Sequence, residues 1–137
     1  MTPDQIRLIQ DSFAKVDPIR DQAAELFYTR LFETDPSLRP LFPDDMTEQK
    51  KKLMATIALV VASLDRIEQV MPAVRNLGKS HAGYGVKAAD YDTVGGALLW
   101  TLEQGLGPAW NSDVAAAWTV AYGFLATEMQ AAAASPA

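Results

Sequence analysis

The amino-acid sequence predicts an all-α protein, and three features of the chain lead to this fold class. Apolar residues recur every three or four positions along most of the chain, which is the spacing of one helix face. Segments with this spacing are bounded by proline, glycine, aspartate and threonine, which begin and end helices. Runs that alternate apolar and polar residues, as strands do, are not found. We therefore expect residues 1–137 to form one domain of five long helices, one short proline-rich helix and a helix that carries the only histidine.

Cap signals predict where the first two helices begin. Thr2-Pro3 with Gln5 forms a capping box, in which a cap hydroxyl and a glutamine side chain satisfy the first free N–H groups. Asp17-Pro18 repeats the cap-and-proline signal and opens a second helix, which ends before Asp35-Pro36. The residues expected to face the core are Ile6, Ile9, Phe13 and Val16, followed by Ala23, Leu26, Phe27 and Leu31.

The middle of the chain is predicted to contain a short helix and then a long one. The prolines of residues 36–43 prevent a long helix, and we expect one short turn of helix that presents Leu41 and Phe42 to the core. Asp44 or Asp45 is the expected cap of the long helix. Its basic triplet, residues 50–52, is interpreted as a solvated face, or as a place where one lysine pairs with an acidic ligand group. The opposite face consists of Gln49, Leu53, Thr56, Ile57, Val60 and Leu64.

Three helices are predicted in the second half of the chain. A linker, residues 65–69, leads to the first, which begins near residues 70–72. Asp90 is the expected cap of the second, and Asn111 or Ser112 that of the last. The run 131–137 is expected to fray. The residues expected to face inward are Tyr91, Val94, Leu98 and Leu102, followed by Val114, Trp118, Ala121, Tyr122, Leu125 and Met129.

His81 is the only histidine, and it lies on an apolar helix face. Helical spacing places it with Val74, Leu77 and Gly78, and the glycines at 83 and 85 then end the helix. A buried imidazole is either a hydrogen-bonded core residue or a metal ligand. One ligand residue cannot hold a bare metal ion, but it can hold a metal that brings four ligands of its own, as haem does. Both interpretations stay open at this stage.

Composition excludes several classes of function. The net charge of −5 and the isoelectric point of about 4.7 argue against nucleic acid and anionic membranes as partners. The absence of cysteine excludes disulfides, thiolate catalysis, zinc ribbons and iron–sulfur clusters. The first residues lack a signal-peptide pattern, and the longest apolar run, residues 57–62, is too short to span a bilayer. We therefore expect a cytoplasmic protein.

Sequence motifs for other chemistry are also missing. Gly78, and not a glutamate, lies three residues before His81, which excludes the Glu-x-x-His pair of di-iron helical bundles. The glycines at 105 and 107 close a helix before Pro108 and do not form a phosphate loop. Tyr28 and Gln49 place polar groups on apolar helix faces, and each alone is typical of a satisfied core group. Together with His81 in an all-α chain, they indicate a cavity with donors on one side and an iron ligand on the other.

Several segments, in their order and spacing, carry a family resemblance. They are residues 26–32, Asp35-Pro36 with Leu41-Phe42, Gln49 with Leu53, then His81, residues 91–95 and residues 117–123. From residue 6 to about residue 129, the chain resembles the globins, in particular the bacterial single-domain globins related to the haem domain of flavohaemoglobins.

The resemblance implies a haem b cofactor and a set of residues that hold it. It implies that His81 is the proximal iron ligand and that Tyr28 and Gln49 are distal residues, with Leu53 one turn further on. It also implies that Phe42 packs against the haem, and we expect Lys52 to reach a haem propionate. The remaining pocket residues expected on this basis are Leu77, Val86, Tyr91 and Val94.

A bis-histidyl haem is excluded because His81 is the only histidine. The sixth iron position is then empty, or it is held by water, by an exogenous ligand such as O2, NO or CO, by Tyr28 or by a lysine. Reversible O2 binding is the implied function, with Tyr28 and Gln49 stabilising the ligand. One alternative is nitric oxide dioxygenation with a separate reductase, since a reductase domain follows the globin in flavohaemoglobins. A gas sensor or a haem-free interaction module is the second alternative. The family's polarising glutamate is replaced by Ala133, and Glu128, five residues earlier, is a poor substitute. A backbone carbonyl is the alternative partner of the proximal histidine, and the sequence leaves the partner open.

Overall fold

The computed structural model describes residues 1–134, and it contains helices joined by short connections. No strand is found within these residues, so the predicted all-α class is confirmed. Four of the connections are 3-10 helices: η1 (Asp17–Ile19), η2 (Pro36–Leu41), η3 (Leu64–Gln69) and η4 (Gly107–Ala109). The six α-helices are α1 (Pro3–Val16), α2 (Arg20–Thr34), α3 (Thr47–Ala62), α4 (Met71–Gly83), α5 (Ala88–Leu106) and α6 (Ser112–Ala134).

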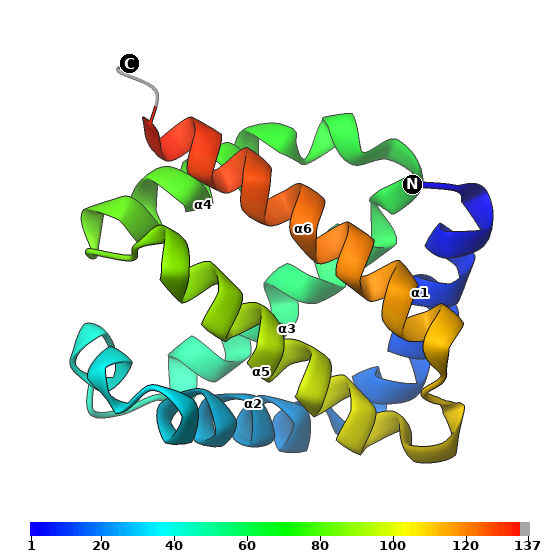
Figure 1. The fold of residues 1–137 in the computed structure, drawn as a ribbon, viewed down its shortest axis with the longest axis horizontal. Coiled ribbons are helices and arrows are strands. Elements are labelled where there is room, and N and C mark those ends of the chain that lie inside the picture. The colour runs from blue at the N-terminus through cyan, green and yellow to red at the C-terminus, as the bar shows by residue number, and fades with distance from the viewer. Residues whose placement is uncertain (135–137) are drawn as a thin grey trace.

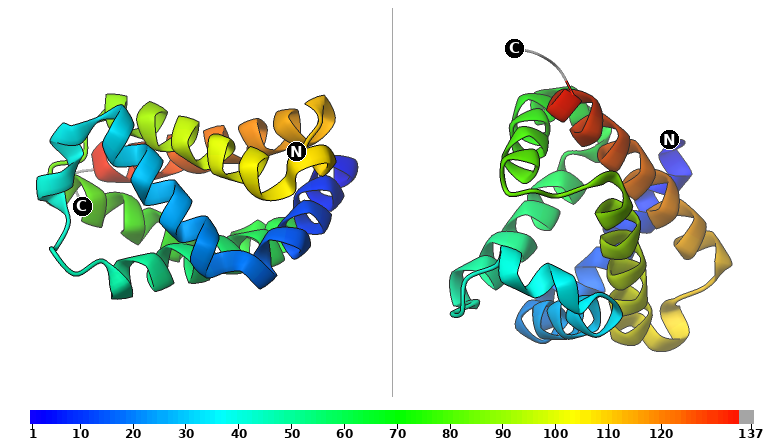
Figure 2. Two further views of the ribbon diagram at one scale, coloured as in Figure 1. Left: turned by 90° about the horizontal axis from the view of Figure 1, so that it is seen from below. Right: turned by 60° about the vertical axis from the view of Figure 1, so that its left-hand side comes forward.

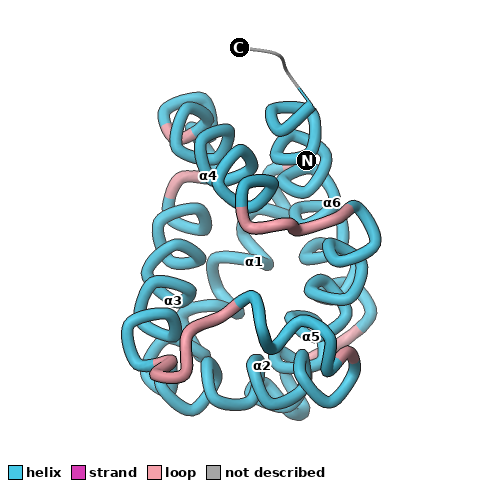
Figure 3. The backbone as a smooth tube through the Cα atoms, turned by 90° about the vertical axis from the view of Figure 1, so that its left-hand side faces the viewer, coloured by secondary structure: helices cyan, strands magenta, loops and turns pink. Residues whose placement is uncertain are grey.

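Helix α6 organises one side of the molecule. It runs diagonally from α1 to α4 and packs against both of them (Figure 1). Helix α2 lies at the opposite edge, where it packs against α5 and α3, and the view from below shows it crossing both (Figure 2). This arrangement places α3 across the molecule from α6 and α5, with α4 at the same end as the last turns of α6 (Figure 3).

The core consists of two apolar clusters. The larger one lies between α1, α3, α5 and α6, and it includes Ile9, Phe13 and Trp118. The smaller one lies between α2, η2 and α5, and it includes Tyr28 and Leu31. Two half-buried leucines pack against both clusters and so connect them: Leu53 and Leu98.

Two of the predicted caps are confirmed. The Thr2 hydroxyl accepts the Gln5 N–H at 3.1 Å, and the Thr2 N–H donates to the Gln5 side chain at 3.0 Å, which completes the capping box. The side-chain oxygen of Asn111 accepts the Val114 N–H at 3.0 Å and caps α6. Helix α4 ends at Gly83, and Gly85 adopts a φ of +86°, which glycine reaches without steric cost.

Two other predicted caps are wrong in register. Helix α3 begins at Thr47, and Asp45 lies one residue before the cap position, where its carboxylate accepts the Thr47 N–H at 3.0 Å. Helix α5 begins at Ala88, so Asp90 lies inside its first turn and accepts the Lys87 N–H at 2.9 Å. In both cases the carboxylate satisfies a free N–H group from a neighbouring position, a choice that the sequence pattern does not resolve.

Two further expectations differ from the structure. Leu41 was expected to face the core, but it is exposed, and Leu38 is buried in its place because η2 turns as a 3-10 helix. The run 131–137 was expected to fray, yet α6 continues through Ala134 with Ala132 buried, and residues 135–137 lie outside the described part of the chain. None of the helices in residues 1–134 combines the length and the apolar character needed to cross a bilayer.

Candidate functional site

An apolar cavity of about 340 Å³ lies between α3 and the helices α4, α5 and α6. Its volume is in the range of about 300–1,000 Å³ that is typical of small-molecule sites. Apolar side chains dominate its walls, so the cavity suits a flat apolar ligand and not a hydrated ion. Its walls include Leu53, Thr56, Ile57 and Val60 of α3, Val74, Leu77 and His81 of α4, Tyr91, Val94 and Leu98 of α5, and Tyr122, Leu125 and Met129 of α6.

His81 is half-buried in the α4 wall of this cavity, and its tautomer follows from its hydrogen bond. Its Nδ1 lies 2.6 Å from the carbonyl oxygen of Leu77, one turn earlier in the same helix. A carbonyl oxygen only accepts, so Nδ1 carries the proton and Nε2 keeps its lone pair. A bond of this kind fixes the ring orientation of metal-ligating histidines. The imidazole is therefore prepared to bind a metal through Nε2.

No group of three or more His, Cys, Asp or Glu side chains that could hold a bare metal ion occurs in the described part of the chain. A single imidazole on an apolar wall fits a metal that is already held by a macrocycle.

Gly78 sets how closely α4 approaches α6 beside the histidine. A Cβ atom at this position would lie 2.2 Å from the carbonyl oxygen of Met129, far inside contact distance. The two helices are in close contact, and Gly78 lies one turn before His81. The missing side chain at residue 78 therefore determines where the imidazole stands in the cavity.

Two tyrosines, Tyr91 and Tyr122, line the cavity beside His81. The ring centroid of Tyr91 lies 6.3 Å from that of His81. The Tyr122 hydroxyl donates to the backbone oxygen of Tyr91 at 2.5 Å, and its ring fills the space above Gly95, where a Cβ atom would come within 2.7 Å. Burial raises the pKa of the Tyr122 phenol well above its usual value, as do the neighbouring charges of Tyr91 and Asp92. The phenol of Tyr122 is therefore protonated and a donor at neutral pH.

Tyr28 of α2 and Gln49 of α3 form a hydrogen-bonded pair. The side-chain amide of Gln49 donates to the Tyr28 hydroxyl oxygen at 3.2 Å. Burial raises the pKa of Tyr28, and the bond from Gln49 opposes this shift only in part, so the phenol is neutral. Because its oxygen accepts from Gln49, the Tyr28 proton is directed elsewhere. The pair thus presents a fixed O–H donor in an apolar surrounding.

Aromatic rings surround Tyr28 on the side of η2. Phe42 meets the Tyr28 ring edge to face at a centroid distance of 5.6 Å, and Phe27 does so at 4.9 Å. Phe32 lies 5.9 Å from Tyr28 and 5.4 Å from Phe42. The Tyr28 ring therefore has little freedom to turn.

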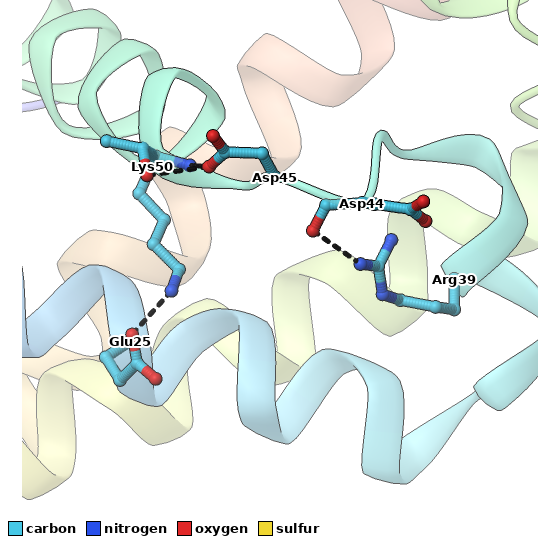
Figure 4. Close-up of polar contacts among 6 residues, drawn as sticks. Glu25, Arg39, Asp44, Asp45 and Lys50 are labelled. Atoms are coloured by element: carbon cyan, nitrogen blue, oxygen red, sulfur yellow. Dashed lines mark hydrogen bonds and ion pairs between the residues drawn. The ribbon is translucent and has the colours of Figure 1, made fainter.

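The three lysines of α3 at residues 50–52 differ in their surroundings: one forms an ion pair with α2, and the other two are exposed. Lys50 Nζ lies 2.5 Å from a Glu25 carboxylate oxygen and ties α3 to α2, next in sequence to Gln49 (Figure 4). Lys51 pairs with Glu48 on the exposed face at 3.9 Å. Lys52 is exposed and does not line the cavity.

The structure brings most of the predicted pocket residues to the cavity. Leu53, Leu77, His81, Val86, Tyr91 and Val94 line it, whereas Tyr28, Phe42, Gln49 and Lys52 do not. The Tyr28 cluster adjoins the cavity because Leu53 and Val94 contact both. The sequence did not assign the α6 residues of the walls to the pocket, because Tyr122, Leu125 and Met129 were expected only as core residues. The same holds for further wall residues on α3, α4 and α5, which include Thr56, Ile57, Val60, Val74 and Leu98.

Comparison with known proteins decides the family. The model of the Globin family matches residues 25–129, more than half of the chain. The chain belongs to the globin family. This globin is 30% identical over 136 residues to neuroglobin of Danio rerio, with 89% of the chain and 86% of the relative covered. It is 34% identical over 105 residues to the flavohemoprotein of Bacillus subtilis (strain 168), a match that covers 73% of the chain and 26% of that longer protein.

Solved structures agree with this assignment. A bacterial globin from Campylobacter jejuni superposes with a TM-score of 0.85 at 25% identity, and 96% of each chain is covered. A putative nitric oxide dioxygenase from Rhodothermus marinus, engineered as a carbene transferase, superposes with a TM-score of 0.88 at 27% identity, covering 98% of this chain and 94% of the other. The globin fold and the resemblance to bacterial globins and flavohaemoglobins are thus confirmed, and the chain is a haem-binding globin.

Proposed function

We propose that this globin holds haem b through Nε2 of His81 and binds O2 reversibly on the opposite side of the iron. The observation that supports it most directly is the bond from His81 Nδ1 to the Leu77 carbonyl, on the wall of an apolar cavity. That bond leaves Nε2 as the free ligand atom. Haem would supply, when bound, an iron that coordinates the His81 imidazole and takes a diatomic gas such as O2, NO or CO.

Contacts with the haem are assigned to residues of both walls. Leu77, Val86 and Val94 provide apolar contact on the histidine side, and Leu53 provides it on the α3 side. Phe42 extends the apolar surface from the Tyr28 cluster. We assign the exposed Lys52, one turn after Gln49 on α3, to an anionic haem propionate. These side chains exclude water, so hydrogen bonds inside the pocket gain strength.

Tyr28 and Gln49 are the residues that we assign to ligand stabilisation. The neutral Tyr28 phenol donates to the partial negative charge that O2 acquires, and Gln49 holds the phenol in place through its 3.2 Å bond. A donor fixed in advance needs no reorganisation when the ligand arrives. Slow release of O2 follows from this arrangement.

Reversible O2 binding is tested by spectroscopy on the full chain. The protein is loaded with hemin, reduced, and titrated with O2, and the O2 is then removed under argon. We expect a Soret shift that saturates with O2 and reverses on its removal. Lack of hemin uptake, or complete oxidation of the iron in the first cycle, would contradict O2 storage or transport, and the former would favour a haem-free interaction module.

Nitric oxide dioxygenation is the second candidate, favoured by the likeness to the putative nitric oxide dioxygenase from Rhodothermus marinus. In this reaction O2, NO and one electron combine to give nitrate, and a separate reductase supplies the electron. The hydrogen bond that we assign from Tyr28 to O2 would act in this reaction too. NO is added to the O2-loaded protein together with a flavin reductase and NADH, and nitrate is counted. Many nitrates per protein establish turnover, whereas a single equivalent followed by a stable ferric form leaves O2 binding as the function.

A further inference from the structure

The loop between η2 and α3 is held by one side chain. The Arg39 guanidinium donates to three consecutive backbone oxygens, those of Phe42 at 3.3 Å, Pro43 at 3.0 Å and Asp44 at 3.2 Å. Figure 4 shows the last of these bonds. Guanidinium is the side-chain group whose planar fork of donors can serve several acceptors at once. Arg39 thus fixes the backbone of the segment that carries Phe42.

Arg39 is also in contact with the aromatic residues around Tyr28. Its guanidinium carbon lies 5.3 Å from the centroid of the Phe32 ring, a cation–π distance. Phe32 packs against Phe42 at 5.4 Å, and Phe42 packs against Tyr28 at 5.6 Å. A continuous path of contacts therefore leads from Arg39 to the Tyr28 phenol, through the loop backbone and through the ring of Phe32.

We propose that Arg39 is a positioning residue, which holds Phe42 against Tyr28 and thereby fixes the direction of the Tyr28 hydroxyl. Gln49 restrains the phenol from the α3 side through its hydrogen bond, and Phe42 restrains the ring from the loop side. Without the three bonds from Arg39, the Phe42 ring has room to move and the phenol gains a second orientation. The inference rests on the proposed role of Tyr28 as the donor to the bound gas.

The experiment compares three variants of the haem-loaded protein. Arg39→Met removes the donors and keeps much of the side-chain volume. Arg39→Lys keeps the charge but not the fork, so we expect it to behave like Arg39→Met. Arg30→Met is the matched control, because Arg30 is on α2 and also covers an aromatic ring, that of Trp100 at 5.0 Å, but makes no bond to the loop among the contacts described.

Ligand release and the CO stretching band are the readouts. We expect O2 dissociation to become about two- to tenfold faster in both Arg39 variants, the range for weakening one hydrogen bond. We also expect the CO stretching band to broaden or split, because the donor then samples two orientations. Arg30→Met should leave both unchanged. Unchanged O2 release and CO stretch in Arg39→Met would overturn the proposal.

A second set of measurements separates this inference from the proposed function. In a Tyr28→Phe background, Arg39→Met should have no further effect on O2 release, and a persisting effect would overturn the path through Tyr28. Nuclear Overhauser contacts between the rings of Phe42 and Tyr28, in the CO-bound protein, report the positioning directly. Their loss in Arg39→Met supports the positioning role even if Tyr28→Phe shows that Tyr28 does not stabilise the gas, and their retention contradicts it.

Discussion

His81 in the cavity wall and Tyr28 in the adjoining aromatic cluster are oriented by different means. The His81 imidazole is oriented by a backbone carbonyl of its own helix, four residues earlier. The Tyr28 phenol is oriented by the Gln49 side chain, which belongs to another helix and lies 21 residues away in the chain. The contact of His81 is thus local and depends on helical geometry, whereas the contact of Tyr28 is long-range and depends on how α2 and α3 pack.

In the proposed function, His81 holds the cofactor and the Tyr28–Gln49 pair stabilises the bound gas, so the two roles depend on two different kinds of contact. A backbone acceptor is present whatever the side chain at residue 77, so the tautomer of His81 is insensitive to most substitutions around it. The Tyr28–Gln49 pair consists of two side chains, and replacing either one removes it. Substitutions of Tyr28 or Gln49 should therefore change ligand kinetics without changing haem binding, whereas substitutions of His81 should weaken haem binding itself.

The largest effect is expected from His81→Ala, which removes the proximal ligand and keeps a good helix former. Hemin affinity should fall by more than about 100-fold, beyond the 10- to 100-fold typical of residues behind a ligand. Hemin titration followed at the Soret band measures it, with circular dichroism as a check on the fold. Added imidazole should restore a Soret band, and Ser80→Ala, on the exposed side of α4, should bind hemin normally. If His81→Ala bound hemin with the affinity of the parent protein, the proposal that His81 holds the haem would be wrong.

Tyr28→Phe should have the next largest effect, and on ligand release alone. The loss of one hydrogen bond in a dry site corresponds to about 1–3 kcal/mol, so O2 should dissociate about five- to 150-fold faster. Stopped-flow displacement of O2 by CO measures this rate. Tyr84→Phe is the control, because Tyr84 is 71% exposed beyond the end of α4. Equal rates in Tyr28→Phe and the parent would refute the distal role.

Gly78→Ala tests whether the close approach of α4 to α6 is needed to place His81 for hemin binding. The added methyl would lie 2.2 Å from the Met129 oxygen, so the helices must separate. We expect the free energy of unfolding to fall by about 1–3 kcal/mol in urea titration, together with a weaker hemin affinity. Gly96→Ala is matched to it, since no atom lies within 4 Å of its added methyl. That variant should be as stable as the parent or gain about 0.5–1 kcal/mol.

The smallest effect is expected on the free energy of unfolding at alkaline pH, and it comes from Tyr122 in the cavity wall. Its pKa is raised in the folded state by burial, whereas an unfolded tyrosine ionises near its ordinary pKa of about 10. The unfolded state therefore loses its proton first, and the free energy of unfolding should fall as the pH rises above about 10, by up to about 1.4 kcal/mol per pH unit. Below pH 10 the stabilisation is fully present. Tyr122→Phe should reduce the alkaline slope measured by urea titration, and an unaltered slope would argue against this linkage.

Local features of the sequence determined the helices and the histidine. Apolar spacing and cap signals identified the long helices, since both depend on residues within a few positions of each other. The capping box at Thr2 and the apolar face of His81 followed from the same rule. The sequence did not determine the positions of Asp45 and Asp90 relative to the first residues of their helices, because a carboxylate can accept N–H groups from several neighbouring positions.

Only the tertiary structure decided which partners the key side chains have. The bond from Gln49 to Tyr28 joins residues 21 positions apart and depends on how α2 and α3 pack. The contact of Gly78 with α6 is likewise invisible in the sequence, where a glycine in a helix looks only destabilising. By itself the sequence determined an all-α chain with one inward-facing imidazole, because helical periodicity is a local property. The tertiary structure decided how the Tyr28 phenol beside the cavity is held, because that contact joins residues far apart in the chain.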